Sequence, residues 1–251
     1  MSASSAGQRR GRQVAVKKRS PMTTFYWVLG AVVLLGAAAL VTFAALRGGG
    51  DIAAREVKAP VGNIAAGMSY TNETGQAISL PAGLWYKGDP NAPVKVVEYS
   101  DFQCPSCASF NSIYAESITR NYVETGRVQF IYHEFPLQQH ANAVPSAEAA
   151  RCAGDQGKFW QMHDTLFAKQ TEWESDGNAV SRFAGYAAAL GMDRGAFESC
   201  MAADTHLAAV NASGAASQAA NIQATPTFYV NGKKADASTL KQAIDAALQG
   251  N

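Results

Sequence analysis

The sequence predicts an α/β fold that carries an inserted all-helical subdomain and is preceded by an N-terminal transmembrane helix and a flexible linker. Residues 94–133 have the pattern strand, helix, strand, which is typical of a βαβ unit with a parallel strand pair. Residues 141–222 are rich in alanine and contain helical spacing without a strand pattern. Because this stretch is too long for a single crossover helix, we expect a helical insertion at about 141–222.

The N-terminal region has the charge pattern of a membrane anchor. Residues 1–24 carry a charge of +6 with no acidic residue, whereas the whole chain is +1, so the remainder is −5. Residues 25–46 contain no charged side chain and would extend roughly 33 Å as a helix, enough to cross a bilayer core. Basic residues remain on the cytoplasmic side. We therefore predict a basic cytoplasmic tail, a single-pass transmembrane anchor in the cell membrane, and an extracytoplasmic C-terminal part.

A cleaved signal peptide is the alternative interpretation of this region. Its apolar core would be about 7–15 residues long and would be followed by a small-x-small cleavage site. The segment from Phe43 to Arg47 is a poor site of that kind, so a retained anchor is favoured. A basic tail on a mildly acidic body is not typical of a nucleic-acid-binding protein, and we expect no nucleic acid partner.

Residues 47–87 are rich in glycine, proline and small polar residues, and we predict a linker or loosely ordered arm, with a first short strand at Leu84–Tyr86. The catalytic domain is expected over 88–251. It begins with a buried strand at Val94–Val97, and a second strand follows at 127–133. The helix between them has one apolar face, made by Phe110, Ile113, Tyr114 and Ile118.

The C-terminal part of the domain has the pattern of a hairpin followed by a helix. Residues 225–230 form a third strand, and Asn231-Gly232 is a strong two-residue turn that leads into a short strand near Lys234. The last helix has an apolar face made by Leu240, Ile244 and Leu248. Among the aromatic residues, Trp85 and Trp173 are expected at the rim of the surface.

Two cysteines lie where the first strand of the domain meets its helix. Cys104 and Cys107 flank Pro105 and Ser106, and Pro105 suits the first helical turn, where no backbone N–H is needed. A thiol at the start of a helix is stabilised as a thiolate by the helix dipole. A second thiol three residues later can close a disulfide with the first. This arrangement predicts a redox-active dithiol.

The chain has four cysteines, which allow three disulfide pairings. We favour Cys104 with Cys107 and Cys152 with Cys200, because the membrane segment suggests an oxidising compartment for the domain. The alternative for Cys152 and Cys200 is a pair of buried free thiols. The four histidines are scattered and none has zinc-site spacing relative to the cysteines, so we predict no metal and no cofactor.

Several separate stretches, in this order, resemble the DsbA-like thiol–disulfide oxidoreductases, which have a thioredoxin-like fold with an inserted helical domain. The overall pattern is similar to the membrane-tethered bacterial members of that family. The stretches are Val-Glu-Tyr-Ser-Asp-Phe-Gln-Cys-Pro-Ser-Cys at 97–107, Glu-Phe-Pro-Leu at 134–137, Ala-Ala-Arg-Cys-Ala-Gly-Asp-Gln-Gly-Lys-Phe-Trp at 149–160 and Ala-Thr-Pro-Thr-Phe at 224–228.

The resemblance implies roles for the matching residues. Cys104 would be the exposed attacking thiol and Cys107 the buried resolving thiol. Thr225 and Pro226 would form the loop that faces the disulfide, with Pro226 in cis and unable to donate a backbone hydrogen bond. Together with Pro105 and Ser106, this loop would contact the substrate. The alternative for Pro226 is an ordinary edge-strand proline. Cys152 matches a cysteine position of tethered relatives, and Cys200 would be its structural partner.

Glu98 lies six residues before the first cysteine, where the family places a carboxylate beneath the dithiol. Buried there, it would have a raised pKa and could exchange a proton with Cys107. The alternative is a strand-edge glutamate that points to water. Ser106 stands where oxidising members most often have histidine, so the redox direction is left open by the sequence.

These observations predict an extracytoplasmic oxidoreductase that oxidises the thiols of client proteins through Cys104 and Cys107. A membrane redox partner, quinone-linked in the family, would reoxidise it. Three alternatives remain: a reductase or isomerase supplied by an electron-donating membrane protein, a copper(I) carrier that uses Cys104 and Cys107, and a module that holds unfolded clients.

Overall fold

The computed structural model describes residues 56–250. Its centre is the predicted βαβ unit, in which β5 (Val94–Ser100) and β6 (Val128–Glu134) pair in parallel. Every residue of β6 is buried, as expected for a central parallel strand. The connection between the two strands is helical, and its segments are α2 (Pro105–Phe110), η1 (Asn111–Ala115), α3 (Glu116–Ile118) and η2 (Thr119–Val123).

A six-stranded sheet is built around this pair, in the order β1-β4-β6-β5-β7-β8. All the added strands pair antiparallel: β1 (Val61–Asn63), β4 (Trp85–Lys87), β7 (Thr227–Val230) and β8 (Lys233–Ala235). The predicted hairpin is present, and both turn residues have positive φ, 46° at Asn231 and 84° at Gly232. A Cβ at Gly232 would lie 2.1 Å from the carbonyl oxygen of Thr71, so the turn also requires glycine for space.

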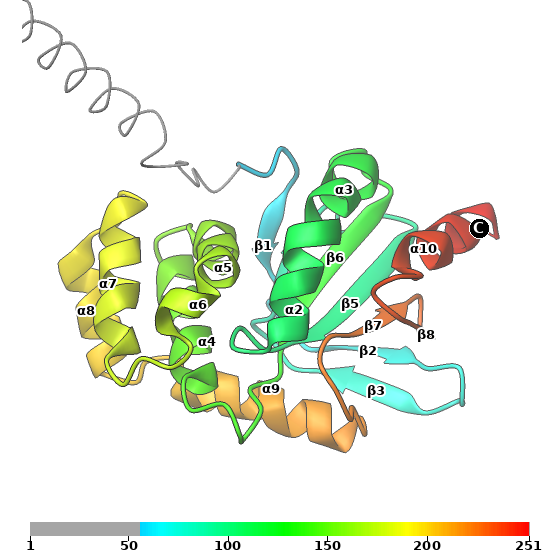
Figure 1. Cartoon of the computed structure of the whole chain (residues 1–251). Coiled ribbons are helices and arrows are strands. Elements are labelled where there is room, and N and C mark those ends of the chain that lie inside the picture. Colours follow the sequence, from blue (N-terminus) through cyan, green and yellow to red (C-terminus); the bar gives the residue numbers. More distant parts are fainter. Residues whose placement is uncertain (1–55, 251) are drawn as a thin grey trace, which may run out of the picture. The chain divides into compact units, whose positions relative to one another are not determined.

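The predicted helical insertion lies between β6 and β7. Its helices are α4 (Ala143–Gly154), α5 (Phe159–Ala168), α6 (Gln170–Trp173), α7 (Ala179–Ala189), α8 (Arg194–Ala202) and α9 (Leu207–Ala219). Figure 1 shows α4 to α8 as a cluster to one side of the sheet, whereas α9 runs back beneath it toward β7. The helix α4 comes so close to β4 that a Cβ at Gly154 would lie 2.2 Å from the ring of Trp85.

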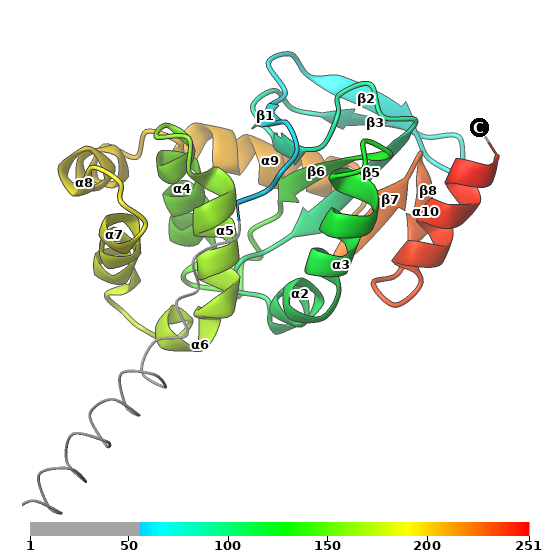
Figure 2. The same ribbon diagram turned by 90° about the horizontal axis from the view of Figure 1, so that it is seen from above.

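Two apolar layers cover the two faces of the sheet. One face packs against α2, α3 and α10 (Leu240–Gln249), and the other is covered by α9 and by a hairpin of β2 (Met68–Thr71) and β3 (Ala77–Leu80), as Figure 2 shows from above. Alternate residues of β5 point into the two layers. Val96 belongs to the layer with α2, α3 and α10, and Val97 belongs to the layer with the β2–β3 hairpin. The dithiol cysteines belong to the helical layer.

The prediction of a linker or arm over 47–87 is wrong for the part that the structure describes. The strands β1 to β4 all lie in this segment, and Ile78, Leu80 and Leu84 are at most 1% exposed. Among the described glycines of this segment, Gly75 and Gly83 lie in turns at positive φ, and Gly62 lies within β1. The short strand predicted at Leu84–Tyr86 is confirmed as β4, whereas β1 to β3 are only three or four residues long, so their alternation is too brief to stand out among the glycines.

The prediction that Trp173 lies at the rim of the surface is also wrong. Its side chain is fully buried, packs against Phe183 at a ring-centroid distance of 5.3 Å, and donates a 2.9 Å hydrogen bond to the carbonyl oxygen of Leu166. Trp85 is half-buried and stacks on Phe159 at 4.7 Å. The Trp173 ring therefore packs within the helical insertion, and the Trp85 ring packs between the sheet and the insertion.

The predicted cytoplasmic tail and the predicted anchor at 25–46 lie outside the described residues. Within residues 56–250, no helix is both long enough and apolar enough to cross a membrane.

Candidate active site

Both dithiol cysteines lie at the beginning of α2. Cys104 is the N-cap residue with extended backbone (φ −73°, ψ 122°), and Pro105 occupies the first turn, as predicted. The carbonyl oxygen of Cys104 accepts hydrogen bonds of 3.1 Å from the backbone N–H groups of Cys107 and Ala108. The helix therefore begins at the first cysteine, and the Cys104 sulfur lies at its positive end.

Both thiols are free and both are largely enclosed. Cys107 is completely buried, in agreement with its predicted place beneath Cys104. Cys104 was predicted to be exposed, but only 7% of its surface is accessible, because the loop at Thr225 packs against it. Little of Cys104 and none of Cys107 is therefore open to an approaching sulfur.

The two thiols have opposite electrostatic environments. The pKa of Cys104 is lowered, chiefly by a hydrogen bond from the Cys107 thiol, although its own burial opposes this. The Thr225 side chain and the backbone N–H groups of Cys107 and Ser106 lower it further. Burial, followed by the same thiol–thiol hydrogen bond, raises the pKa of Cys107. The negative charge is therefore favoured on Cys104 and the proton on Cys107.

The loop before β7 faces the dithiol, as predicted. The peptide bond between Thr225 and Pro226 is cis, and the Sγ of Cys104 lies 3.4 Å from the carbonyl oxygen of Thr225. These residues are 121 positions apart, so only the sheet order, with β7 beside β5, brings them together. Pro226 has no N–H, and the half-buried loop therefore presents an acceptor and no backbone donor at this position.

Glu98 lies in β5 with only 2% of its surface exposed, so the alternative of a glutamate that points to water is wrong. Burial raises its pKa to about 7, and the Ser100 side chain and the positive charge of Lys87 partly oppose this shift. The charge of Glu98 in turn contributes to the raised pKa of Cys107. A carboxyl group that titrates near neutral pH beside a buried thiol can accept or return that thiol's proton.

Amide side chains that the sequence analysis did not single out connect the helical insertion to the dithiol loop. Gln170 of α6 is buried, and its Nε2 donates to the carbonyl oxygens of Phe102 at 2.7 Å and Cys104 at 3.0 Å. Gln103 donates to the carbonyl oxygen of Glu174 at 2.7 Å. Isolated glutamines carry no pattern in a sequence, so these contacts could be found only in the folded chain.

Asp101 makes a second connection near the dithiol. It is 2% exposed, and its Oδ2 accepts hydrogen bonds from the ring of His140 at 2.7 Å and from the backbone N–H of Leu137 at 3.0 Å. Burial raises the pKa of Asp101, and these hydrogen bonds oppose the increase. Its Oδ1 accepts from the backbone N–H of Gln103. Asp101 therefore holds the turn before Cys104 against the segment that leads into α4.

The other two cysteines form a disulfide between α4 and α8. Cys152 and Cys200 are 48 residues apart in sequence and 5.9 Å apart at Cα. His206 lies beside them and donates to Asp155 at 2.8 Å. Within residues 56–250, Cys152, Cys200 and His206 are the one group that has metal-site spacing. Both sulfurs are bonded to each other, so this group offers no thiolate ligand in the disulfide form.

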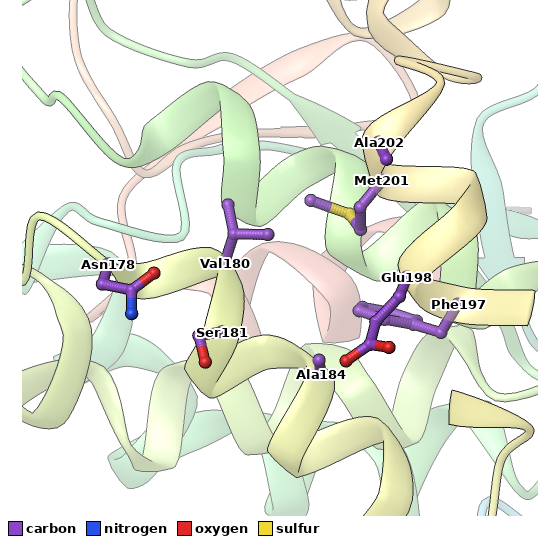
Figure 3. A pocket seen from close by; sticks show the side chains of 8 residues that line it. All are labelled: Asn178, Val180, Ser181, Ala184, Phe197, Glu198, Met201 and Ala202. Atoms are coloured by element: carbon purple, nitrogen blue, oxygen red, sulfur yellow. The ribbon is translucent and has the colours of Figure 1, made fainter. Parts of the chain in front are cut away.

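Two surface pockets lie on helices of the domain. One, of about 330 Å³, borders the dithiol helix and is lined by Pro105, Ala108, Ser109, Ser112, Phe167, Ala168, Gln170 and Thr171. The other, of about 290 Å³, lies between α7 and α8, with Val180, Phe197 and Met201 around it (Figure 3). Only the first shares residues with the dithiol segment.

A family model described as Thioredoxin matches residues 81–249, which include the dithiol, Glu98 and the loop at Pro226. The chain belongs to the thioredoxin family. Among its relatives is disulfide bond formation protein D of Bacillus subtilis, which is 31% identical over 180 residues, covering 65% of this chain and 76% of that protein. This thioredoxin-family chain is therefore a DsbA-like thiol–disulfide oxidoreductase, and the predicted enzyme class is confirmed.

Solved structures agree with this assignment. The oxidised crystal structure of BdbD from Bacillus subtilis superposes with a TM-score of 0.60 and 29% identity, covering 66% of this chain and 92% of that one. Wolbachia pipientis α-DsbA1, at 21% identity and a TM-score of 0.58 over 66% of this chain and 90% of its own, shares the fold. The thioredoxin-like fold with a helical insertion is thus confirmed.

Other relatives of this thioredoxin-family chain are larger proteins. The Na⁺/H⁺ antiporter NhaA 1 of Salinispora arenicola is 34% identical over 163 residues, which are 64% of this chain and 24% of the antiporter. The chain therefore spans about a quarter of the length of this relative.

Proposed function

We propose that the chain oxidises the thiols of client proteins by dithiol–disulfide exchange through Cys104 and Cys107. The observation that carries this proposal is the unequal environment of the two thiols: hydrogen bonds lower the pKa of Cys104, and burial raises that of Cys107. Such a pair has one sulfur that is a good leaving group and another that is protected from competing attack.

The first step starts from the Cys104–Cys107 disulfide. A client thiolate attacks the Sγ of Cys104, the bond to Cys107 breaks, and a mixed disulfide between client and Cys104 forms. Cys107 leaves with the electron pair and takes a proton, because burial disfavours its charged form. Glu98, whose charge acts on Cys107, would supply that proton.

In the second step a second client thiolate attacks the client sulfur of the mixed disulfide. Cys104 leaves as a thiolate, held by the backbone N–H groups of Ser106 and Cys107. The client has then lost two electrons and gained a disulfide, and the enzyme holds the dithiol. A membrane redox partner, quinone-linked in the resembling family, would reoxidise it.

The client is proposed to bind around the opening above Cys104. Pro105 and Ser106 border it on one side, and Thr225 with Pro226 borders it on the other, where the loop contacts the Cys104 sulfur. The groove beside α2 continues from Pro105 and could hold residues that flank the client cysteine. Its lining combines apolar side chains, among them Pro105 and Phe167, with polar ones such as Gln170.

The direction of the reaction follows from how strongly the Cys104 thiolate is stabilised. Stabilising the thiolate favours the reduced enzyme and so makes the disulfide more oxidising. Ser106 adds no positive charge, but the backbone donors and the Cys107 thiol lower the pKa of Cys104 without one. A reductase or isomerase kept reduced by a membrane electron donor is the alternative for the same site.

The location proposed for the domain is outside the cell membrane, with residues 25–46 as the anchor in the lipid bilayer and residues 1–24 in the cytoplasm. The uninterrupted apolar run and the basic residues before it support this topology. The disulfide between Cys152 and Cys200 supports an oxidising compartment.

The test is the reduction potential of the Cys104–Cys107 pair in glutathione buffers. We expect a value near −120 mV, as for a strong oxidant, whereas a value near −270 mV would establish a reductase. The Cys152→Ala/Cys200→Ala variant provides a control, since its titration reports the dithiol alone.

A further inference from the structure

Asp101 is a buried acid that takes no part in the two proposed exchange steps. It follows β5 directly and begins the turn 101–104 that leads into the dithiol helix, and its side chain is 0% exposed. A carboxylate in such a place requires hydrogen bonds that replace the lost water. All of its polar atoms have partners, some in the dithiol segment and some in the segment that follows β6.

The carboxylate of Asp101 is held from both of these segments. Its Oδ1 accepts the backbone N–H of Gln103 at 2.8 Å. Its Oδ2 accepts the backbone N–H of Leu137 at 3.0 Å and the ring Nδ1 of His140 at 2.7 Å. Both the imidazolium and the neutral ring with its proton at Nδ1 make this last bond. Three donors therefore fix the two oxygens and, with them, the main chain of Asp101.

The main chain of Asp101 contacts both dithiol cysteines. Its carbonyl oxygen accepts the backbone N–H of Cys104 at 3.0 Å. Its own N–H donates to the Cys107 sulfur, which lowers the pKa of that thiol against the larger effect of burial, which raises it. Because Cys107 is completely buried, a protein donor must take the place of water whenever this sulfur carries a charge.

We propose that the backbone N–H of Asp101 stabilises the Cys107 thiolate during exchange, and that the Asp101 carboxylate and His140 position this N–H. This inference rests on the proposed function of the dithiol. The Asp101 N–H contacts a reacting sulfur and is a catalytic group, whereas His140 is a positioning residue that acts through the carboxylate. A donor fixed in advance needs no rearrangement when the charge forms.

The N–H acts in both directions of the exchange. When a client thiolate attacks Cys104, the bond between the two enzyme sulfurs breaks and Cys107 leaves with the electron pair, next to the Asp101 N–H. In the opposite direction Cys107 first loses its proton, with Glu98 as the proposed acceptor. The thiolate then attacks the Cys104 sulfur of the mixed disulfide, and the client sulfur leaves with the electron pair. Asp101 exchanges neither electrons nor protons.

The test follows the two thiols separately in the full-length chain, reduced at Cys104–Cys107 only, with 5,5′-dithiobis(2-nitrobenzoate) as the disulfide. Cys104 attacks first and releases one thionitrobenzoate, leaving a mixed disulfide. Cys107 then attacks that disulfide and releases the second. Stopped-flow absorbance resolves the two releases, and only the second requires the Cys107 thiolate.

The most direct variant replaces the amide N–H of Asp101 by an ester oxygen, which keeps the carboxylate and removes the donor. We expect its second release to slow by roughly tenfold or more, since a hydrogen bond to a charged group contributes at least that factor. The first release should keep its rate. Asp101→Asn should also slow the second release, because an amide side chain has one acceptor oxygen for three donors.

His140 is tested by two substitutions. His140→Phe removes the ring donor, and we expect the second release to slow by about threefold, since the N–H remains but is held less firmly. His140→Asn places an amide N–H where Nδ1 stood and should recover the wild-type rate. The matched control is His206→Phe, which removes a ring that bonds Asp155 at 2.8 Å beside the other disulfide. Its two releases should match those of the wild type.

An unchanged second release in the ester chain would overturn the role of the Asp101 N–H. Equal slowing of both releases would also overturn it, because that indicates a general loss of order in the turn. An unchanged His140→Phe, or a His140→Asn chain as slow as His140→Phe, would overturn the role of His140. If the wild-type chain releases no second thionitrobenzoate, the proposed function of the dithiol itself fails, and this failure is distinct from the others.

Discussion

The chain contains two pairs of cysteines in very different surroundings. Cys104 and Cys107 lie at the start of a helix, the charge of a buried carboxyl group acts on Cys107, and a small part of Cys104 is accessible. Cys152 and Cys200 join two helices of the insertion, with Cys152 1% exposed. The first pair has donors that stabilise a thiolate, and the second closes a long loop. The neighbours of a cysteine pair, and not the cysteines themselves, therefore decide whether the pair reacts or stabilises the fold.

The largest expected effect separates the two pairs by activity. Cys104→Ala removes the attacking sulfur, and we expect the rate of client oxidation to fall by at least ~10³-fold. The free energy of unfolding should change by no more than about 1 kcal/mol. The measurement is disulfide formation in a reduced two-cysteine peptide. Full retention of client oxidation by this variant would remove the basis of the oxidoreductase mechanism at Cys104.

The second prediction separates the pairs by stability. The Cys152→Ala/Cys200→Ala chain lacks a cross-link over 48 residues, and its free energy of unfolding should fall by roughly 4 kcal/mol. Its rate of peptide oxidation should stay at the wild-type value at temperatures where it is folded. Urea unfolding of both proteins measures the difference. A loss of activity in the folded variant would contradict a purely structural role for this disulfide.

The third prediction concerns the carboxyl group that only the reactive pair has. Burial raises the pKa of Glu98 to about 7, so the folded chain binds more protons than the unfolded chain between about pH 4.5 and pH 7. The cost of the buried charge therefore grows as pH rises through this range. Glu98→Gln should stabilise the chain by up to ~3 kcal/mol at pH 8 and have little effect at pH 4.

Urea unfolding of wild type and Glu98→Gln from pH 4 to pH 8 tests this expectation. The same variant should slow the Cys107 step, because amide nitrogen and oxygen do not accept its proton at neutral pH. A stability difference that is constant across the range would show that Glu98 does not titrate there.

The smallest expected effect concerns the hydrogen bonds between the helical insertion and the segment that leads into Cys104. Gln170→Ala removes the donor to the carbonyl oxygens of Phe102 and Cys104, which should cost about 1–3 kcal/mol. Hydrogen exchange should become faster in residues 102–107. The matched control is Gln223→Ala. This side chain is exposed, and within residues 56–250 it donates hydrogen bonds to Asn221. Equal behaviour of both variants would mean that the Gln170 contacts do not order the loop.

Much of the fold could be predicted from local patterns. The apolar run before Cys104, the helical spacing after it and the turn residues Asn231-Gly232 all produced the elements expected of them. Local patterns failed where elements were short. The three-residue and four-residue strands β1 to β3 have too few alternations to be distinguished from a glycine-rich linker. Trp173 was misplaced because α6 has four residues and no periodicity to assign it a face.

The sequence by itself determined the chemistry that this protein can perform: two thiols three residues apart at a helix start, a carboxyl group six residues earlier and a proline before a later strand. Those features depend on spacing along the chain, which sequence records directly. Only the tertiary structure decided which groups surround the thiols. Tyr132 comes from β6, Gln170 from the insertion and Thr225 from the loop before β7, and the packing of the sheet against the helices brings them to the dithiol region. Burial, which sets the pKa values of Glu98 and Cys107, likewise exists only once those distant segments have packed together.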